Sequence, residues 1–147
     1  MKIQNIRHTG IVTDNLKSSL KFYQKLLGFK IKKRMIESGN TIDKISNLKN
    51  TKVETVKMTA GKKTDMIELL YYHSHKRKNN SKNYNISKIG ISHFAVTVKN
   101  INITYRMFKR SGIKFISPPK LSKDGNVKVT FCRAPEGTLI ELVQELR

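Results

Sequence analysis

The chain carries one pattern twice, as 6-IRHTGIVTDNLKSSLKFYQKLLGFKI-31 and as 91-ISHFAVTVKNINITYRMFKRSGIKFI-116. When the two stretches are aligned, His8 matches His93 and Asn15 matches Asn100. Apolar residues recur at helical spacing in both copies, as Leu16, Leu20 and Tyr23 and then as Ile101, Tyr105 and Phe108. An internal repeat indicates the architecture before any single element is considered, and this one predicts two related modules.

Each copy begins with a strand that leads into a helix. The segments RHTGIVT and SHFAVTV alternate and are rich in β-branched residues, which is typical of strands. Asparagine or aspartate follows, at Asp14 and Asn15 and at Asn100 and Asn102, and these side chains can accept hydrogen bonds from the free amides at a helix start. We expect the helices to end near residues 28 and 112, where a glycine tolerates a left-handed turn.

Each copy then continues with three further strands. FKIKKRMIE and IKFISPP return as strands, and Pro118 and Pro119 break the second one early. TVKMTA with TDMIELLYY predicts a hairpin, as does VKVTFCR with TLIELVQEL across the APEG turn at 134–137. The sequence thus predicts an α+β fold, in which two pseudo-symmetric βαβββ modules form a curved, open mixed sheet with the helices outside.

Two polar stretches lie between these elements. Residues 36–52 are predicted to be an inserted loop with a helical turn, and the basic residues 73–88 a linker between the modules. We therefore expect one domain over residues 1–147. Within it, module one covers about 1–72, the linker about 73–88 and module two about 89–147.

The composition narrows the class of partner. The 147 residues include 30 Lys and Arg against 10 Asp and Glu, for a net charge of +20. Such a surface favours an anionic partner, but no nucleic-acid-reading motif accompanies the scattered charges, so we expect a small molecule rather than nucleic acid. No apolar run is long enough for a membrane span, and no signal-peptide pattern opens the chain. Together with one cysteine, Cys132, these features predict a cytoplasmic protein without a disulfide framework.

Strand alternation places two histidines and two glutamates on matching faces. His93 lies opposite the apolar face of SHFAVTV, while Glu68 in MIELL and Glu141 in LIELV lie opposite the isoleucines and leucines around them. A carboxylate on a half-buried face is costly unless it is paired or bound to metal. These three residues and His8 could therefore converge on a divalent metal. For each imidazole, a core histidine held by a hydrogen bond is the alternative.

The donor set leaves the identity of the metal open. Imidazole suits nickel, zinc, cobalt and iron, and carboxylate oxygen suits harder ions such as manganese. Four protein ligands with water or substrate oxygens would form an octahedral centre with a reactive open position, unlike the closed tetrahedral site of structural zinc.

Four stretches of the chain, in this order, resemble the vicinal oxygen chelate superfamily. They are HTGIVTDNLKSSLKFYQKLLGF, MIELL, SHFAVTV and FCRAPEGTLIELVQ, and they cover most of the chain apart from the two basic loops. The superfamily includes glyoxalase I, methylmalonyl-CoA epimerase, extradiol dioxygenases and bleomycin-resistance proteins. The resemblance implies one domain of this type with a metal bound by His8, Glu68, His93 and Glu141, an order most similar to that of glyoxalase I.

The resemblance also implies a function, a metal-dependent lyase or isomerase of glyoxalase type that acts on a small acidic or thiol-adduct substrate. The metal would chelate two vicinal oxygens and stabilise an enediolate during proton transfer, with Glu141 as the preferred general base and Glu68 as the second choice. The alternatives are an extradiol-type dioxygenase, an enzyme like methylmalonyl-CoA epimerase, and a non-catalytic protein that sequesters a ligand. The epimerase pattern usually has glutamine where Glu68 stands, and the dioxygenases use one glutamate fewer.

Further residues flank the predicted site. Tyr72, Arg133 and Lys128 are candidate contacts for an anionic substrate, although solvated surface is the favoured interpretation of Lys128. His73 and His75 enter the basic linker and are expected to lie outside the metal site. The superfamily often pairs modules between two chains. The resemblance therefore implies a homodimer, in which the ligands could come from one chain or from both.

Overall fold

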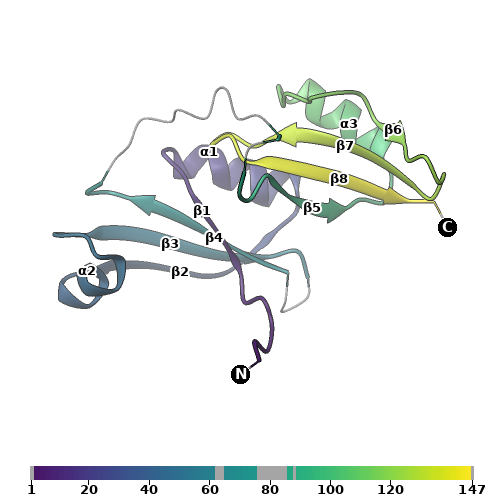
Figure 1. The fold of residues 1–147 in the computed structure, drawn as a ribbon. Coiled ribbons are helices and arrows are strands. Elements are labelled where there is room, and N and C mark those ends of the chain that lie inside the picture. The colour runs from purple at the N-terminus through teal and green to yellow at the C-terminus, as the bar shows by residue number, and fades with distance from the viewer. Residues whose placement is uncertain (1, 62–64, 76–85, 88, 147) are drawn as a thin grey trace. The chain divides into compact units, whose positions relative to one another are not determined.

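The computed structural model describes residues 2–61, 65–75, 86–87 and 89–146. The chain divides into two compact units, Met1–Asn79 and Asn80–Arg147 (Figure 1). Each unit contains one four-stranded mixed sheet, with the strand order β1-β4-β3-β2 in the first and β5-β8-β7-β6 in the second. Residues 76–85 and 88 of the predicted linker lie outside the described residues.

The first unit follows the predicted order of one strand, one helix and three strands. Its elements are β1 (Thr9–Val12), α1 (Leu16–Leu20), a π-helical turn η1 (Lys21–Leu26), β2 (Lys30–Ser38), α2 (Asn40–Ser46), β3 (Lys52–Thr59) and β4 (Met66–Tyr72). β1 runs parallel to β4, whereas β4 and β3, and β3 and β2, pair antiparallel. The loop predicted at 36–52 is a continuation of β2 followed by the short helix α2.

The second unit repeats this topology with a weaker outer strand. Its elements are β5 (His93–Thr97), α3 (Ile101–Arg110), β6 (Lys120–Leu121), β7 (Val127–Arg133) and β8 (Leu139–Glu145). The strand expected at IKFISPP is reduced to one bridge between Phe115 and Cys132, and β6 begins only after Pro118 and Pro119. Proline has no amide hydrogen for the sheet ladder, so the strand cannot pair through these two positions.

The helices begin and end at the predicted residues. The side chains of Asn15 and Asn100 each accept a hydrogen bond of 3.0 Å from the backbone amide three residues later. Gly28 and Gly112 follow the helical segments with φ angles of 76° and 82°, which a residue with a side chain rarely adopts.

Alternate strand residues build the core of each unit and so fix the opposite face. In the first sheet Ile67 and Leu69 are buried on either side of Glu68, and in the second Ile140 and Leu142 flank Glu141 in the same way. Helix α1 contacts β4, and α3 contacts β8. We call the face that carries each glutamate the site face of its sheet. Within the described residues, none of the helices is both long and apolar enough to span a membrane.

Candidate metal-binding pairs

His8 and Glu68 meet on the site face of the first sheet. The register between the parallel strands pairs Gly10 with Glu68, and His8 lies two residues before Gly10 and therefore on the same face. The Nε2 atom of His8 lies 3.1 Å from Oε2 of Glu68, and the side chains are 28% and 14% exposed. The carboxylate is thus largely removed from water and held by the imidazole.

His93 and Glu141 repeat this arrangement in the second sheet. Ala95 pairs with Glu141 in parallel register, and His93 again lies two residues before that partner. The Nε2 atom of His93 lies 3.2 Å from Oε2 of Glu141. The same atoms, the same register and nearly the same distance therefore recur in the two units.

The spacing within each pair fits two roles. Two ligand atoms that each lie about 2.1 Å from a metal, at a right angle to one another, are about 3 Å apart. The observed 3.1 and 3.2 Å match this spacing and also match a hydrogen bond between an imidazole and a carboxylate. In the part of the chain that the structure describes, no three His, Cys, Asp or Glu side chains gather into a metal-holding group, and each unit holds a His–Glu pair on its site face.

The two imidazoles differ in the contact that their second ring nitrogen, Nδ1, makes. Nδ1 of His93 lies 2.7 Å from Oγ of Ser92, and such a contact fixes the ring while Nε2 faces Glu141. Nδ1 of His8 is buried and has no hydrogen-bond partner among the described residues. The ring of His93 is therefore held at both nitrogens, and the ring of His8 at one.

The pairs also differ in the residue that lies across the strand from the glutamate. Lys57 is opposite Glu68, and its Nζ lies 3.5 Å from Oε1 of that carboxylate. Phe131 is opposite Glu141, and its ring meets the ring of His93 edge-on at 5.1 Å. Sequence reasoning missed both neighbours. They follow from the hairpin register, which strand alternation alone does not supply.

Of the three predicted substrate contacts, two lie on the site face of their sheet and one lies on the opposite face. Tyr72 lies on the site face of the first sheet, and Arg133 on the site face of the second, where its Nη1 donates to the carbonyl oxygen of Gly137 at 3.1 Å. Lys128 is in register with Gln144 and falls on the opposite face of β7. The structure therefore does not bring Lys128 to the side of its strand that carries Arg133.

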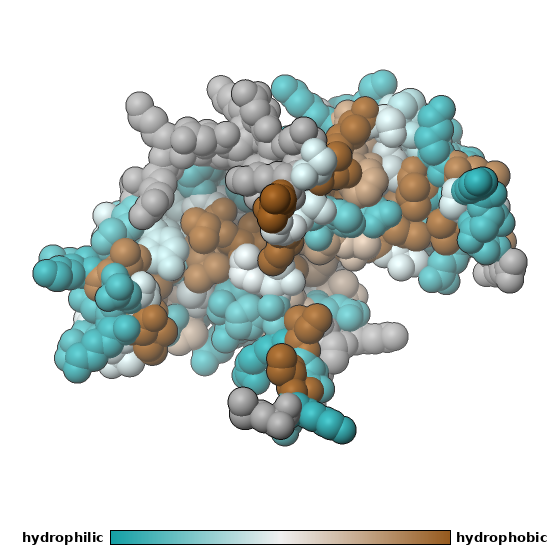
Figure 2. Space-filling view, viewed as in Figure 1, coloured by the Kyte–Doolittle hydropathy of each residue, from teal (hydrophilic) through white to brown (hydrophobic). Residues whose placement is uncertain are grey.

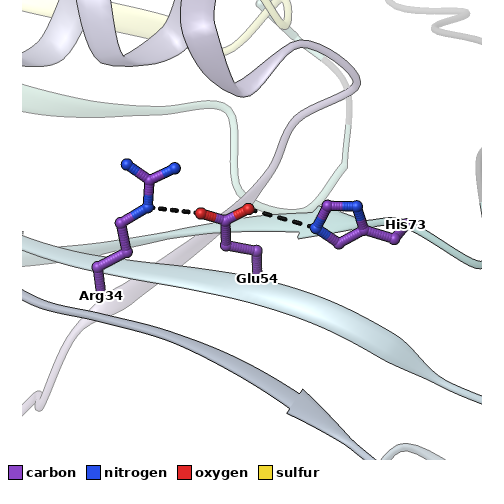
Figure 3. A network of polar contacts seen from close by, with 3 residues as sticks. All are labelled: Arg34, Glu54 and His73. Atoms are coloured by element: carbon purple, nitrogen blue, oxygen red, sulfur yellow. Dashed lines mark hydrogen bonds and ion pairs between the residues drawn. The ribbon is translucent and has the colours of Figure 1, made fainter.

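His73 belongs to a separate network, which Figure 3 shows. Its Nε2 lies 3.3 Å from Oε2 of Glu54, whose Oε1 lies 2.5 Å from Nε of Arg34. Glu54 pairs with Tyr71 in β4 and so lies on the core side of the sheet, away from the site face. Burial alone would raise the pKa of Glu54, but the hydrogen bonds and charges of Arg34 and then His73 outweigh it and hold the pKa below its usual value. His73 is thus held by Glu54 and lies away from the site face.

Comparison with known proteins identifies the family. The family model described as Glyoxalase/Bleomycin resistance protein/Dioxygenase superfamily matches residues 5–142, a span that contains both His–Glu pairs. The uncharacterized protein YwbC of Bacillus subtilis (strain 168) is 23% identical over 141 residues, which are 96% of this chain and 98% of that protein.

The fold is similar to that of several solved structures. A glyoxalase family protein from Bacillus cereus has a TM-score of 0.90 at 19% identity, over 100% of this chain and 97% of its own. A V278E mutant of glyoxalase I from Zea mays has a TM-score of 0.70 at 19% identity, over 97% of this chain and 45% of its own. The trypanothione-dependent glyoxalase I of Leishmania major has a TM-score of 0.64 at 21% identity, over 97% and 88%. With two βαβββ sheets and a family match over nearly its whole length, the chain belongs to the Glyoxalase/Bleomycin resistance protein/Dioxygenase superfamily.

Proposed function

We propose that the two His–Glu pairs are the two halves of one divalent metal site, and that the protein is a lyase or isomerase of glyoxalase type. The observation that carries this proposal is the match between the pairs, with Nε2 to Oε2 distances of 3.1 and 3.2 Å and the same strand register. Coordination by four ligands from two repeated modules would be expected to show such a match.

The donor set of two imidazoles and two carboxylates suits nickel, zinc, cobalt, manganese or iron. When bound, such an ion would act as a Lewis acid on two vicinal oxygens of the substrate and would favour the enediolate that forms when the neighbouring carbon loses its proton. The proposed substrate is a small acidic molecule or a thiol adduct. Tyr72 and Arg133 are the proposed contacts for its acidic groups, and Lys128, on the other face, is not among them.

Glu141 is the proposed general base. Its Oε2 contacts His93, and Oε1 has no partner in the described part of the structure, so this oxygen is available to take a proton. Both oxygens of Glu68 are already engaged, Oε2 by His8 and Oε1 by Lys57. Glu68 is therefore better suited to hold the metal than to move a proton. A positioned carboxylate typically contributes a factor of about 10² to 10⁴ to such a transfer.

The test is metal binding and turnover measured on the same preparations. The protein is stripped with a chelator, reloaded with each of the five ions, and assayed for isomerisation of the adduct between a thiol and a 2-oxoaldehyde. We expect one ion per chain and turnover with at least one ion. Glu141→Gln is expected to lower turnover by about 100-fold or more while metal stays bound. Glu145→Gln, an exposed control on the same strand, is expected to change neither quantity.

The competing function is that of a metal-free protein that binds and sequesters a ligand. It is favoured by Lys57, since its ammonium already compensates the charge of Glu68 without any metal. A folded protein that binds none of the five ions would support this function and contradict the metal site. Bound iron with oxygen-dependent turnover would instead indicate a dioxygenase.

The proposed assembly is a homodimer in the cytoplasm, with ligands drawn from one chain or from both. Sedimentation gives the number of chains. Mixing a His8→Ala, Glu68→Ala variant with a His93→Ala, Glu141→Ala variant would restore metal binding only if the pairs come from different chains.

A further inference from the structure

Lys57 is a position on the site face at which the two modules differ in charge. It lies opposite Glu68 in the register of β3 and β4, where the second module has Phe131 opposite Glu141. Its side chain is 28% exposed, and the ion pair with Glu68 at 3.5 Å is the only side-chain polar contact that the described residues give it. The first module therefore has a cation directly across from its glutamate, where the second module has an aromatic ring.

The surroundings keep this cation near the carboxylate. Lys57 lies within β3, which is paired on both sides, with β4 and with β2, so its backbone is fixed. Lys33 is directly across from Lys57 on β2 and adds a second positive charge to the same face. The half-buried ammonium thus has a like charge on one side and a carboxylate on the other.

We propose that Lys57 anchors an oxyanion of the ligand beside the proposed metal, and that the ligand class is small molecules such as 2-oxo or 2-hydroxy carboxylates. This inference rests on the proposed function. A divalent ion and the two carboxylates would sum to zero charge, so Lys57 would add one positive charge beside the loaded site. Metal binding also withdraws charge from Glu68 and weakens the pair with Lys57. An oxyanion on the ligand would replace that lost partner of a half-buried ammonium.

A purely structural role for Lys57 makes different predictions. If Lys57 served only to neutralise Glu68, its removal would leave ligand selectivity unchanged and would alter folding or metal affinity instead. Lys57→Met keeps the length of the side chain without the charge, and Lys57→Arg keeps the charge. Lys33→Met is the matched control, because it removes an equal charge from the same face without touching the pair with Glu68.

The experiment compares two chelating probes that share vicinal oxygens and differ by one charge. Oxalate, a dianion, and oxamate, a monoanion, are titrated into the cobalt-loaded protein by calorimetry, after cobalt affinity itself has been measured. We expect the wild-type chain to prefer oxalate. We expect Lys57→Met to bind oxalate about tenfold more weakly, as for loss of one charge-assisted hydrogen bond, and oxamate almost unchanged. Lys57→Arg and Lys33→Met should keep the preference to within about threefold, and all variants should bind cobalt.

The outcomes separate this inference from the proposed function. Cobalt binding with an oxalate preference that survives Lys57→Met would overturn the anchoring role and leave the metal site intact. An equal loss in Lys33→Met would attribute the effect to the general field of the basic face and would also overturn it. A wild-type chain that binds no cobalt would overturn the proposed metal site and this inference together.

Discussion

Both oxygens of the Glu54 carboxylate have a side-chain partner in the folded chain. No sequence pattern predicted this network. Its side chain is 10% exposed, and its two oxygens contact Arg34 and His73 from the neighbouring strand and from the end of β4. The pKa of Glu54 lies below its usual value, because the contacts of these two residues outweigh the opposing effect of burial. The charged form therefore stabilises the folded first unit.

We expect Glu54→Gln to lower the free energy of unfolding at pH 7 by about 1–3 kcal/mol, since a buried charged hydrogen-bond acceptor is lost. A group whose pKa is lowered on folding contributes stability above its unfolded pKa, and loses it as the pH falls through the folded pKa. The difference between wild type and variant should thus shrink as the pH falls below about 4.5. Urea denaturation at several pH values measures this difference in the free energy of unfolding.

The control for this prediction is Glu37→Gln. Glu37 lies on β2, and the described residues show no ion pair or side-chain hydrogen bond for it, so the substitution should change stability by less than about 0.5 kcal/mol. A penalty for Glu54→Gln that stays constant from neutral to acid pH would contradict the ionic role of Glu54 and would indicate packing alone.

The contrast between Glu54 and Glu68 shows what could be predicted for single residues. Glu68 and its three partners in the proposed site follow from the repeat and from strand alternation, and the structure brings each histidine to the glutamate of its own module. The position of Lys57 opposite Glu68 depends on the register between β3 and β4. The sequence alone does not determine this register, because it does not give the length of the turn between the two strands. Lys128 was a candidate contact with solvated surface as the favoured alternative, and alternation along β7 places it on the face opposite Arg133.

Helix α3 is the element whose start is held most fully by side chains. Oδ1 of Asn100 accepts from the amide of Ile103 at 3.0 Å, and Oε1 of Gln144 in β8 accepts from the amide of Ile101 at 2.8 Å. The first contact is local and was predicted from the sequence. The second joins the helix to a distant strand and requires the folded sheet.

We expect Asn100→Ala to destabilise the second unit by about 1 kcal/mol, because the free amide of Ile103 loses its partner. Asn102→Ala is the matched control. Asn102 is exposed within α3 and has no side-chain hydrogen bond among the described residues, so replacing it should cost less than about 0.5 kcal/mol. Thermal unfolding monitored by circular dichroism compares the two. Equal losses in both variants would contradict the capping role of Asn100, because alanine has the higher helix propensity and its introduction inside the helix should not destabilise it.

The π-helical turn η1 and the strand β6 depart from the regular repeat, and the sequence pattern alone does not predict either departure in full. In η1 the amide of Leu27 bonds the carbonyl of Phe22, and this wider turn accompanies the burial of both Phe22 and Tyr23, which are adjacent in sequence. Helical periodicity predicted Tyr23 on the core face but not its neighbour. The strand predicted at IKFISPP was expected to break at Pro118 and Pro119, whereas the short strand β6 after these prolines was not predicted.

On the scale of the whole molecule, the excess of positive charge also protects an open edge. β2 ends the first sheet, and its exposed residues include Lys30, Lys32, Lys33 and Arg34. Figure 2 shows hydrophilic side chains over β2 and α2, with apolar ones between them. Charged residues on an edge strand oppose pairing with the edge of another chain. Part of the net charge of +20 therefore has a structural use that is independent of any ligand.

The alkylation rate of Cys132 can test whether ligands from both units bind the proposed metal. It is the one thiol in the chain, it is fully buried in β7, and burial raises the pKa of its thiol to about 12. Alkylation of Cys132 therefore requires the second unit to open. A ligand that binds only the folded form at 100 times its dissociation constant stabilises that form by about 2.7 kcal/mol, so we expect metal at that excess to slow alkylation by about 100-fold.

The decisive variant lies in the other unit. Glu68 belongs to the first unit and Cys132 to the second, so Glu68→Gln can weaken metal protection of Cys132 only if ligands from both units hold the same ion. We expect Glu68→Gln to remove most of the protection and Glu37→Gln, also in the first unit, to leave it intact. If Glu68→Gln kept the full protection while Glu141→Gln lost it, the metal would be bound by the second unit without Glu68, and the four-ligand site would have to be abandoned.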